Sequence, residues 1–503
     1  MANSYILAID QGTSSTKTIV FDKSGNVLSK ATEPLKTHYM EGGWVEQEPD
    51  EIYKNVLQSV KACLENFTAN GGDIKDIKSC GISNQRETFL VWDKAGKPLY
   101  NAVVWQCKRS IEVCTKLIAE GLEETVKNKT GLIIDPYFSG SKLIWLNENI
   151  GSVKNNLQSG DAFFGTIDTW LLYKLTGGTN YLTDYTNASR TLLFNLKDLS
   201  WDNSLIDAFG LSGINLPEPK PSAYHFGESL FEGLFEEPLP ITAMIGDSHA
   251  AAFGEGCTIP GTAKATLGTG CSVLMNIGNE PKVSASGMIT TICWSTEERV
   301  DYALEGVIVS CGSTIEWLKN ELGLFSESKQ TEAMATSVPN NNGVYIVPAF
   351  SGLGAPYWDM DRKASIEGLT FDCNKNHIVR ASLEVIAYQI KDVLEAMQAD
   401  AGLDIHQLML NGGLTSNLFV LEFLADLLDT KVFNGKMPDV SALGAAYLSG
   451  LGAGIFSNLD EIRNVDAQKS VISSGKYKED MHKYYSGWKK AVKSGIEEHS
   501  GNL

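Results

Sequence analysis

A short apolar run followed by a glycine-threonine turn occurs twice in this chain of 503 residues. Residues 6–9 precede a Gly12-Thr13 turn, residues 263–267 precede a Gly268-Thr269-Gly270 turn, and a second apolar run follows each turn. Each copy predicts a β-hairpin. Glycine lets the backbone approach a ligand closely, and successive amide groups in such a turn can bind a phosphate. One hairpin alone is more often structural, but the pair predicts a duplicated fold that grips a nucleotide from both sides.

The order of the remaining elements predicts an α/β protein with two domains. Single hydrophobic cores stop growing beyond about 250–300 residues, so a chain of this length should form more than one. Strands alternate with amphipathic segments such as 50–67, which indicates a layered α/β architecture. A long helix is expected over 381–397, and small residues at 441–447 predict a second, closely packed helix. We place the domains at 1–253 and 254–503.

Composition limits the partners and the compartment. The net charge is −19 without a long basic run, which argues against nucleic acid or an anionic membrane as the main partner. No apolar run approaches the roughly 18 residues that span a bilayer, and the first residues do not form a charged and then apolar leader. The nine cysteines are scattered, as is typical of reduced thiols. We expect a cytoplasmic protein without membrane insertion that acts on small molecules.

Two aspartates that follow apolar strands are candidates for catalysis and metal binding. Asp10 ends the first strand beside the glycine turn, and a carboxylate next to a phosphate suits Mg²⁺, which prefers one or two carboxylates plus substrate oxygens. Asp247 follows the apolar run 241–246, where it can accept a proton from a substrate hydroxyl. Each has a structural alternative, because aspartate also caps turns and helix N-termini.

Other polar and aromatic residues predict binding sites for a hydroxylated substrate and a nucleotide. Arg86 and Glu87 supply donors and an acceptor for the hydroxyls of a polyol or sugar, although an adjacent pair is often a surface ion pair. Trp105 and Tyr137 would supply apolar walls, a role less common than simple core packing. The Asn-Gly-Gly segment 411–417 lies between an apolar run and a helix, as nucleotide-binding loops do. The chain has no Walker lysine motif, so nucleotide chemistry would use the hairpins.

Together these motifs resemble the FGGY family of carbohydrate kinases, and within it the members that phosphorylate glycerol. The resemblance covers nearly the whole chain and is strongest at 10–15, 84–88, 100–107, 130–140, 183–190 and 348–358. It implies two actin-like (ribonuclease H-like) ATPase domains that flank a deep cleft, with the polyol mainly on the first domain and ATP mainly on the second. It further implies transfer of a phosphoryl group from ATP, with Mg²⁺, to a terminal hydroxyl of glycerol to give glycerol 3-phosphate.

The resemblance also implies roles for individual residues. Asp247 would be the general base, and Asp10 and Asp247 would bind the metal. The residues implied to contact the polyol are Arg86, Glu87, Trp105, Tyr137, Asp247, Ser248 and Ser272. Those implied to contact the nucleotide are Thr13, Ser14, Ser15, Lys17, Thr269, Gly312, Glu316, Gly413 and Asn417. We expect a homodimer or a homotetramer.

Two pocket positions depart from the family pattern. The residue after the catalytic aspartate, usually Gln, is Ser248, and the residue after Gly-Thr-Gly-Cys, usually Phe, is Ser272. Smaller side chains would widen the pocket, so a four- or five-carbon polyol or ketose is an alternative substrate to glycerol. The other possibility is that neighbouring side chains fill the space and glycerol is still used.

Two further expectations concern activity and regulation. A non-catalytic ATP-binding protein is a third interpretation, which the presence of Asp10, Asp247, Arg86 and Glu87 opposes. The acidic segment 229–237 lacks the Gly-Arg element and the histidine that regulate some relatives. We therefore expect neither regulation by fructose bisphosphate nor phosphorylation of a histidine.

Overall fold

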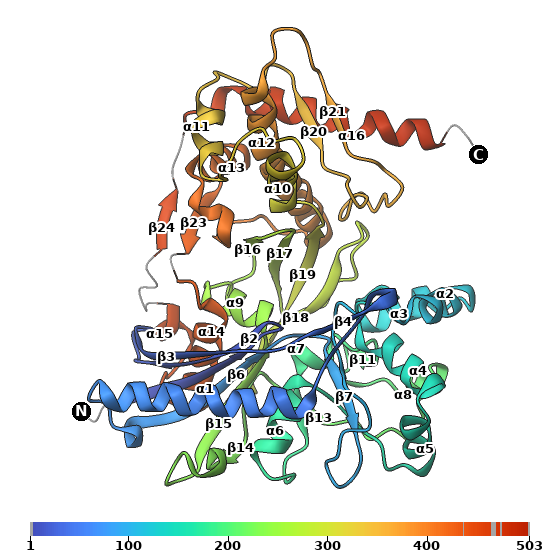
Figure 1. The fold of residues 1–503 in the computed structure, drawn as a ribbon, viewed down its shortest axis with the longest axis vertical. Coiled ribbons are helices and arrows are strands. Elements are labelled where there is room, and N and C mark those ends of the chain that lie inside the picture. The colour runs from blue at the N-terminus through green and yellow to red at the C-terminus, as the bar shows by residue number, and fades with distance from the viewer. Residues whose placement is uncertain (1–3, 436, 464–468, 473–474, 501–503) are drawn as a thin grey trace.

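The computed structural model describes residues 4–435, 437–463, 469–472 and 475–500. They form two lobes, and each lobe is built around a large sheet (Figure 1). Within the described ranges, every helix is too short or too polar to cross a lipid bilayer.

The sheet of the N-terminal lobe has six strands in the order β14-β15-β6-β1-β2-β3. Strands β1, β2 and β3 form an antiparallel meander, whereas β6 runs parallel to β1 and β15 runs parallel to β6. The strands are β1 (Tyr5–Gln11), β2 (Ser15–Phe21), β3 (Val27–Pro34), β6 (Ile77–Asn84), β14 (Ala223–Ser229) and β15 (Leu239–Gly246). The first predicted hairpin is therefore confirmed as β1–β2.

The sheet of the C-terminal lobe has seven strands in the order β18-β19-β17-β16-β22-β23-β24. It repeats the plan of the first sheet, because β16 pairs antiparallel with β17 and parallel with β22. The strands are β16 (Thr262–Leu267), β17 (Cys271–Gly278), β18 (Ile289–Ser295), β19 (Val300–Ile308), β22 (Gln407–Asn411), β23 (Lys431–Gly435) and β24 (Lys469–Ile472). The second predicted hairpin is β16–β17, so the α/β class and the duplication are both confirmed.

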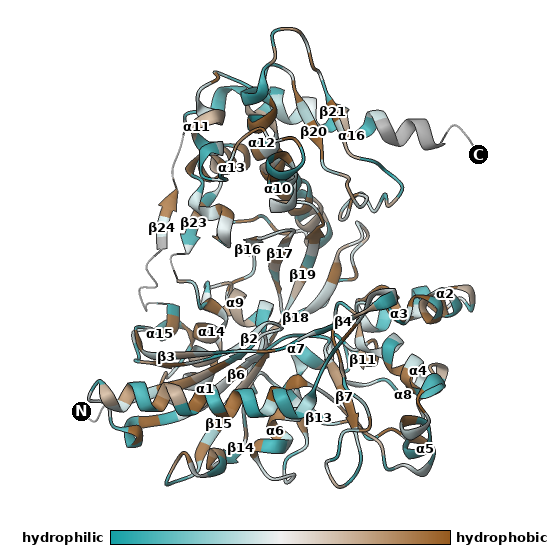
Figure 2. Cartoon of the chain, in the orientation of Figure 1, coloured by the Kyte–Doolittle hydropathy of each residue, from teal (hydrophilic) through white to brown (hydrophobic). Residues whose placement is uncertain are grey.

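Side chains of β1 alternate between the two faces of the N-terminal sheet, as the strand period requires. Leu7 and Ile9 pack in the core beneath α1 and α6, whereas Ile6 and Ala8 pack against α9 and α14. These helices are α1 (Pro49–Ala69), α6 (Ile167–Leu175), α9 (Asp247–Gly254) and α14 (Val440–Gly452). The amphipathic segment expected over 50–67 lies in α1, whose hydrophilic residues alternate with apolar ones in Figure 2.

Helix α14 comes late in the sequence but lies on the N-terminal sheet (Figure 1). It packs closely because glycines remove side chains at the contact: a Cβ on Gly81 would lie 2.2 Å from the carbonyl oxygen of Ala445. A Cβ on Gly444 would lie 1.8 Å from the carbonyl oxygen of Ala250 in α9. The close packing predicted for 441–447 is confirmed, while the boundary between 253 and 254 stays a prediction.

Strand β16 separates the core of the C-terminal lobe from the space between the lobes. Ala263, Ala265 and Leu267 pack in the core with α12 (Lys375–Ala401), the long helix predicted over 381–397. Lys264 and Thr266 lie on the opposite face, because successive side chains of a strand point to opposite sides. That face borders the cavity described below.

Smaller sheets and helices complete the lobes. The remaining strands are β4 (His38–Met40), β5 (Trp44–Gln47), β7 (Phe89–Trp92), β8 (Ala102–Val103), β9 (Phe163–Thr166), β10 (Leu182–Asp184), β11 (Phe194–Asn195), β12 (Ser200–Trp201), β13 (Glu218–Lys220), β20 (Tyr345–Val347) and β21 (Ser365–Glu367). The remaining helices are α2 (Ile111–Ala119), α3 (Glu123–Thr130), α4 (Ser139–Asn149), α5 (Gly151–Ser159), α7 (Tyr185–Ala188), α8 (Asn203–Ala208), α10 (Gly312–Asn320), α11 (Gln330–Thr336), α13 (Leu418–Leu428), α15 (Leu459–Arg463) and α16 (Met481–Ser500).

Candidate active site

A cavity of about 830 Å³ lies between the two lobes. Both recurring hairpins reach it, through Thr13 of the first and through Gly268 and Gly270 of the second. Other lining residues are Arg86, Glu87, Trp105, Tyr137, Arg190, Asp247, Ser248, Lys264, Thr266, Ser272, Glu305, Asn411 and Gly412. Residues from both ends of the sequence therefore meet in one cavity, and they include all seven that were expected to contact the polyol.

The two candidate catalytic aspartates lie at the carboxyl ends of parallel strands. Asp10 is near the end of β1, opposite Ser83 of β6, and its Oδ1 accepts a hydrogen bond from Ser83 Oγ at 2.9 Å. Asp247 follows β15 directly and opens α9. Ligands of open α/β sheets bind at the carboxyl ends of strands, so both aspartates have the position that the chemistry requires.

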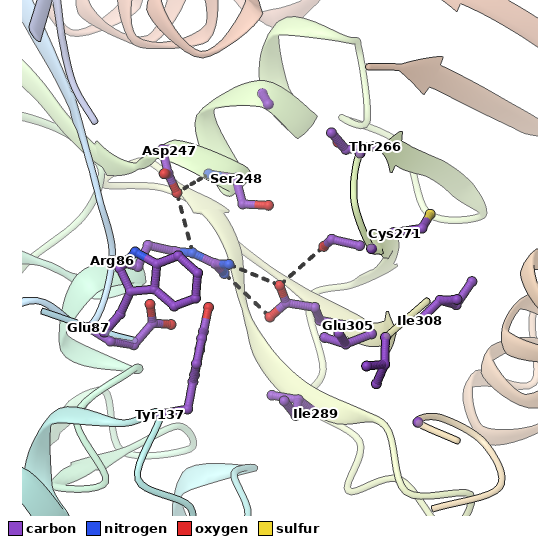
Figure 3. A pocket seen from close by; sticks show the side chains of 18 of the residues that line it. Arg86, Glu87, Tyr137, Asp247, Ser248, Thr266, Cys271, Ile289, Glu305 and Ile308 are labelled. Carbon is purple, nitrogen blue, oxygen red and sulfur yellow. Dashed lines mark hydrogen bonds and ion pairs between the residues drawn. The ribbon is translucent and has the colours of Figure 1, made fainter. Parts of the chain in front are cut away.

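Asp247 faces the cavity from the first turn of α9. Its Oδ1 accepts the backbone N–H of Ser248 at 2.6 Å and lies 3.5 Å from Nε of Arg86 (Figure 3). Burial raises the pKa of the carboxyl group, and the positive charge of Arg86 opposes part of that rise. A carboxylate with a raised pKa accepts a proton more readily near neutral pH, which suits a general base.

Asp10 and Asp247 fit a shared divalent cation. Burial raises the pKa of Asp10 to about 6, and the charge of Asp247 adds to the rise. Carboxylates that repel each other in this way are stabilised by a cation between them. The described residues contain no group of three or more His, Cys, Asp or Glu side chains that would hold a metal by themselves. Mg²⁺ suits such a site, because it is usually bound by one or two carboxylates plus phosphate oxygens and water.

A buried network of charged side chains lies beside Asp247. Arg86 donates hydrogen bonds to both carboxylate oxygens of Glu305, at 3.1 and 3.3 Å (Figure 3). Arg190 donates to Glu305 at 2.7 Å and to Glu87 at 2.5 Å. Burial by itself would raise the pKa of Glu305, but the two arginines hold it well below its usual range. The network keeps the guanidinium of Arg86 oriented between Asp247 and Glu305.

Glu305 and Arg190 were not predicted from the sequence as members of the site. Glu305 is a buried acid in β19, whose neighbours are mostly apolar, and a lone charge in such a strand is the signal that would have found it. Arg190 follows α7 and is 1% exposed. Buried charges of this kind need partners, so each predicts the presence of the other.

Aromatic side chains form the wall of the cavity next to this network. The rings of Trp105 and Tyr137 lie 5.5 Å apart with an interplanar angle of 68°. Nε1 of Trp105 donates to Oγ1 of Thr13 at 2.9 Å. Thr13, expected to contact the nucleotide, is thus hydrogen-bonded to the wall expected to cover the polyol.

The two serines that depart from the family pattern are both in polar contacts. Ser248 Oγ accepts a hydrogen bond from Lys264 Nζ at 3.0 Å. Ser272 Oγ donates to Oε1 of Glu305 at 3.5 Å. Both line the cavity, so this side of the pocket presents hydroxyl groups in place of an amide and an aromatic ring.

Gly268, Gly270 and Gly412 line the side of the cavity expected to bind the nucleotide, and Gly312 packs against Gly268 without lining it. The first amides of α10 bond the second hairpin turn, with Gly312 N–H donating to Gly268 O and Ser313 N–H to Thr269 O, each at 3.0 Å. A Cβ on Gly312 would lie 2.6 Å from Gly268 O. Gly412 has a φ of +101°, and a Cβ there would lie 2.4 Å from Leu267 O. Only glycine fits these close approaches.

Gly413 directly follows Gly412 and is the first residue of the short helix η4 (Gly413–Ser416). A Cβ on Gly413 would meet no atom within 4 Å. The first hairpin turn is closed by Gly12 N–H donating to Ser15 O at 3.0 Å, with Ser14 exposed inside the turn. Gly413, Ser14 and Ser15 therefore lie in the two turn regions that the sequence predicts, and their contacts with a nucleotide stay predictions.

Of the nine residues expected to contact the nucleotide, Thr13 alone lines the cavity, and three of the others have protein partners. Lys17 pairs with Asp439 at 3.2 Å. The carboxylate of Glu316 accepts from Ser328 Oγ at 3.2 Å and lies 3.8 Å from Lys319. The Asn417 side chain caps α13 and also donates to Thr331 at 3.1 Å. A role for these three in nucleotide binding stays a prediction.

Comparisons with known proteins agree with this geometry. Residues 5–254 match the N-terminal domain of the FGGY family of carbohydrate kinases, and residues 263–453 match its C-terminal domain. The chain is 44% identical over 498 residues to a glycerol kinase of Klebsiella pneumoniae, with 98% of each chain covered. It is 46% identical to a glycerol kinase of Pseudomonas savastanoi over 489 residues, which are 97% of this chain and 96% of the relative.

Solved structures show the same fold. A crystal structure of Plasmodium falciparum glycerol kinase with ADP matches with a TM-score of 0.93 and 36% identity, covering 98% of both chains. Gluconate kinase from Lactobacillus acidophilus matches with a TM-score of 0.86 at 20% identity, which shows the fold alone. The predicted pair of actin-like ATPase domains is confirmed. The chain belongs to the FGGY family of carbohydrate kinases.

Proposed function

We propose that this protein transfers the γ-phosphoryl group of ATP to a terminal hydroxyl of glycerol, giving glycerol 3-phosphate and ADP. The observation that carries the proposal is the position of Asp247, which lies 3.5 Å from Arg86 of the buried network and faces the same cavity as the turn of the second hairpin. The whole-length similarity to proteins named glycerol kinase supports the choice of substrate.

Binding of the polyol uses the charged and aromatic residues of the N-terminal lobe. Arg86 donates to hydroxyl oxygens and Glu87 accepts from hydroxyl protons, while Trp105 and Tyr137 cover the carbon chain. The buried partners Arg190 and Glu305 hold Arg86 and Glu87 in place, so little conformational entropy is lost when the substrate binds.

The chemical step is a proton transfer coupled to a phosphoryl transfer. Asp247 accepts the proton of the terminal hydroxyl as the new O–P bond forms and the bond to the ADP oxygen breaks. When bound, Mg²⁺ at Asp10 and Asp247 would neutralise charge on the phosphoryl oxygens. The glycine turns place backbone N–H groups near the phosphates, and the two lobes exclude water, which limits hydrolysis of ATP.

A longer substrate is the second candidate. Ser248 and Ser272 line the cavity with small polar side chains, and Ser272 Oγ is 3.5 Å from Glu305. A fourth hydroxylated carbon would find hydrogen-bond partners there, so a four- or five-carbon polyol or ketose stays an alternative to glycerol. We further propose a cytoplasmic homodimer or homotetramer, which light scattering on the purified protein would test.

Turnover on a substrate panel tests the proposal. Glycerol, erythritol, threitol, xylitol, ribulose and xylulose would be compared with ATP by kcat/KM, and we expect the highest value for glycerol. Asp247→Asn should lower kcat by about 10²- to 10⁴-fold with little change in KM, because it removes the proton acceptor and keeps the shape. If a longer substrate gave a clearly higher kcat/KM, it would replace glycerol as the proposed substrate. An active Asp247→Asn variant would contradict the assignment of Asp247 as the base.

A further inference from the structure

We propose that Lys264, held by the hydroxyls of Ser248 and Thr266, forms an oxyanion subsite that binds the phosphoryl group during its transfer. The inference rests on the proposed function and adds to it a catalytic residue that the motifs of the sequence did not indicate. Two features of the cavity carry it, the balance of its charges and the position of one buried ammonium group.

The sheet places Lys264 on the cavity face of the C-terminal lobe. In β16 the neighbours Ala263 and Ala265 pack in the core, so Lys264 and Thr266 point to the opposite face. Thr266 pairs with Ser272 across β16 and β17, and both line the cavity together with Lys264. One row of polar side chains therefore crosses this face of an otherwise apolar sheet.

The partners of Lys264 are hydroxyl groups. Its Nζ donates to Ser248 Oγ at 3.0 Å and to Thr266 Oγ1 at 3.2 Å, and the residue is only 2% exposed. An ammonium has three donors and a full positive charge, and burying such a charge without an anion is unfavourable. In the part of the chain that the structure describes, no carboxylate lies within ion-pair distance of this nitrogen.

The other cations that line the cavity differ in this respect. Arg86 pairs with Glu305 and lies near Asp247, and Arg190 pairs with Glu305 and Glu87. Their charges are compensated by the protein itself. Within the described residues Lys264 makes no such ion pair, and its charge acts on Asp247 only over a longer distance. An anion bound in the cavity would therefore be its first ion-pair partner.

The surroundings of Lys264 identify which part of the substrates supplies the anion. Ser248 is the residue after the base Asp247, and Thr266 lies two residues before Gly268 of the second hairpin turn. Lys264 is therefore between the group that activates the hydroxyl and the turn expected to bind ATP. The phosphoryl group crosses this space, and a fixed cation there stabilises the charge on its oxygens.

Binding of the product separates this role from others. Isothermal titration of glycerol 3-phosphate, glycerol and ADP would be compared in the wild type, Lys264→Met and the control Lys61→Met, whose lysine is exposed on α1. We expect Lys264→Met to weaken the binding of glycerol 3-phosphate at least tenfold, because a charge-assisted hydrogen bond to the phosphate is lost. The affinities for glycerol and ADP should stay within about twofold of the wild type. The control should change none of the three.

Two results would overturn the subsite. One is an unchanged affinity of Lys264→Met for glycerol 3-phosphate, with a shifted pH profile of kcat, because Lys264 would then only tune Asp247. The other is an equal loss of affinity for glycerol and for glycerol 3-phosphate in Lys264→Met, because Lys264 would then only shape the pocket through Ser248. Lys264→Gln, which keeps a donor but no charge, should behave like Lys264→Met if the charge is what binds the phosphate.

Stability gives a second readout that needs no substrate. Replacing a buried, uncompensated cation by an apolar side chain of similar length should leave the melting temperature of the ligand-free protein unchanged or higher. A fall of several degrees would show that the ammonium supports the fold, and would overturn the inference.

The failure of the proposed function is distinguishable from the failure of the subsite. If the wild type does not phosphorylate glycerol, the proposed function fails. The subsite still predicts that Lys264→Met weakens the binding of inorganic phosphate to the ADP-loaded protein at least tenfold. An unchanged affinity for phosphate would overturn the subsite as well.

Discussion

The two sides of the cavity are built by different means. On the polyol side, Arg86, Arg190 and Glu305 are buried side chains whose charges compensate one another across long stretches of sequence. On the nucleotide side, Gly312 and Gly412 let backbone segments approach so closely that a Cβ would not fit. The first side depends on charge and the second on the absence of side chains. Each should therefore fail under a different kind of substitution.

Glu305→Gln should have the largest effect on the polyol side. It keeps the shape of the side chain but removes the charge that Arg86 and Arg190 share. Leaving buried charges without a partner costs about 3 kcal/mol, and we expect a loss of that size in the free energy of unfolding. Arg86 also loses its fixed orientation, so glycerol should bind more weakly and its KM should rise about 100-fold, which corresponds to about 2.7 kcal/mol of binding, while the KM for ATP should change little.

Glu65→Gln is the matched control for this prediction. Glu65 pairs with Lys61 on the exposed face of α1 at 3.9 Å, and surface pairs contribute less than about 1 kcal/mol. Thermal unfolding and steady-state kinetics would measure both variants. Equal stability of Glu305→Gln and Glu65→Gln would show that the network does not depend on the charge of Glu305.

Gly412→Ala should impair the nucleotide side by a smaller factor. Its φ of +101° and the 2.4 Å approach to Leu267 O force the loop to move when a methyl group is added. Such backbone strain costs about 1–3 kcal/mol, so the KM for ATP should rise about tenfold or more. Gly151→Ala adds the same methyl group at the start of α5, where it meets no atom within 4 Å, and should bind ATP normally. If both variants behave alike, the close approach is not what shapes this side.

The pH dependence of Mg²⁺ binding should be the mildest effect, and it concerns Asp10 and Asp247, the expected ligands of the cation. The raised pKa of Asp10, about 6, means that the group takes up a proton as the pH falls through 6. The cation then loses a ligand, so its affinity should fall about tenfold between pH 7 and pH 5. Titration of the Mg²⁺ requirement of kcat at several pH values would measure this. An affinity for Mg²⁺ that stays the same down to pH 5 would contradict this prediction. Asp10→Asn should bind Mg²⁺ weakly at every pH.

Much of the fold could be predicted from the sequence because it rests on local patterns. The Gly12-Thr13 and Gly268-Thr269-Gly270 turns sit between alternating apolar runs, and those runs became β1–β2 and β16–β17. Asp10 is the penultimate residue of β1 and Asp247 directly follows β15, so apolar runs place both at strand ends whatever the details of packing. Local hydrogen bonding and the period of the side chains are enough for these features.

The resemblance to the family implied roles for individual residues, and the structure places only some of these residues at the cavity. Every residue expected to contact the polyol lines the cavity, whereas Thr13 alone of the nine expected to contact the nucleotide does so. Lys17, Glu316 and Asn417, which were expected on the nucleotide side, are bound to other protein groups. A motif identifies a position along the chain, but the direction of a long side chain depends on the partners that surround it.

The sequence by itself determined the hairpins, the strand ends and the glycines of the turns, because each depends on neighbours close along the chain. Only the tertiary structure decided that Glu305 compensates Arg86, 219 residues away, and Arg190, 115 residues away. It also decided that Lys264 meets hydroxyls and not a carboxylate within the described residues. Charge balance in a cavity is a sum over residues that only folding brings together, and no local pattern contains that sum.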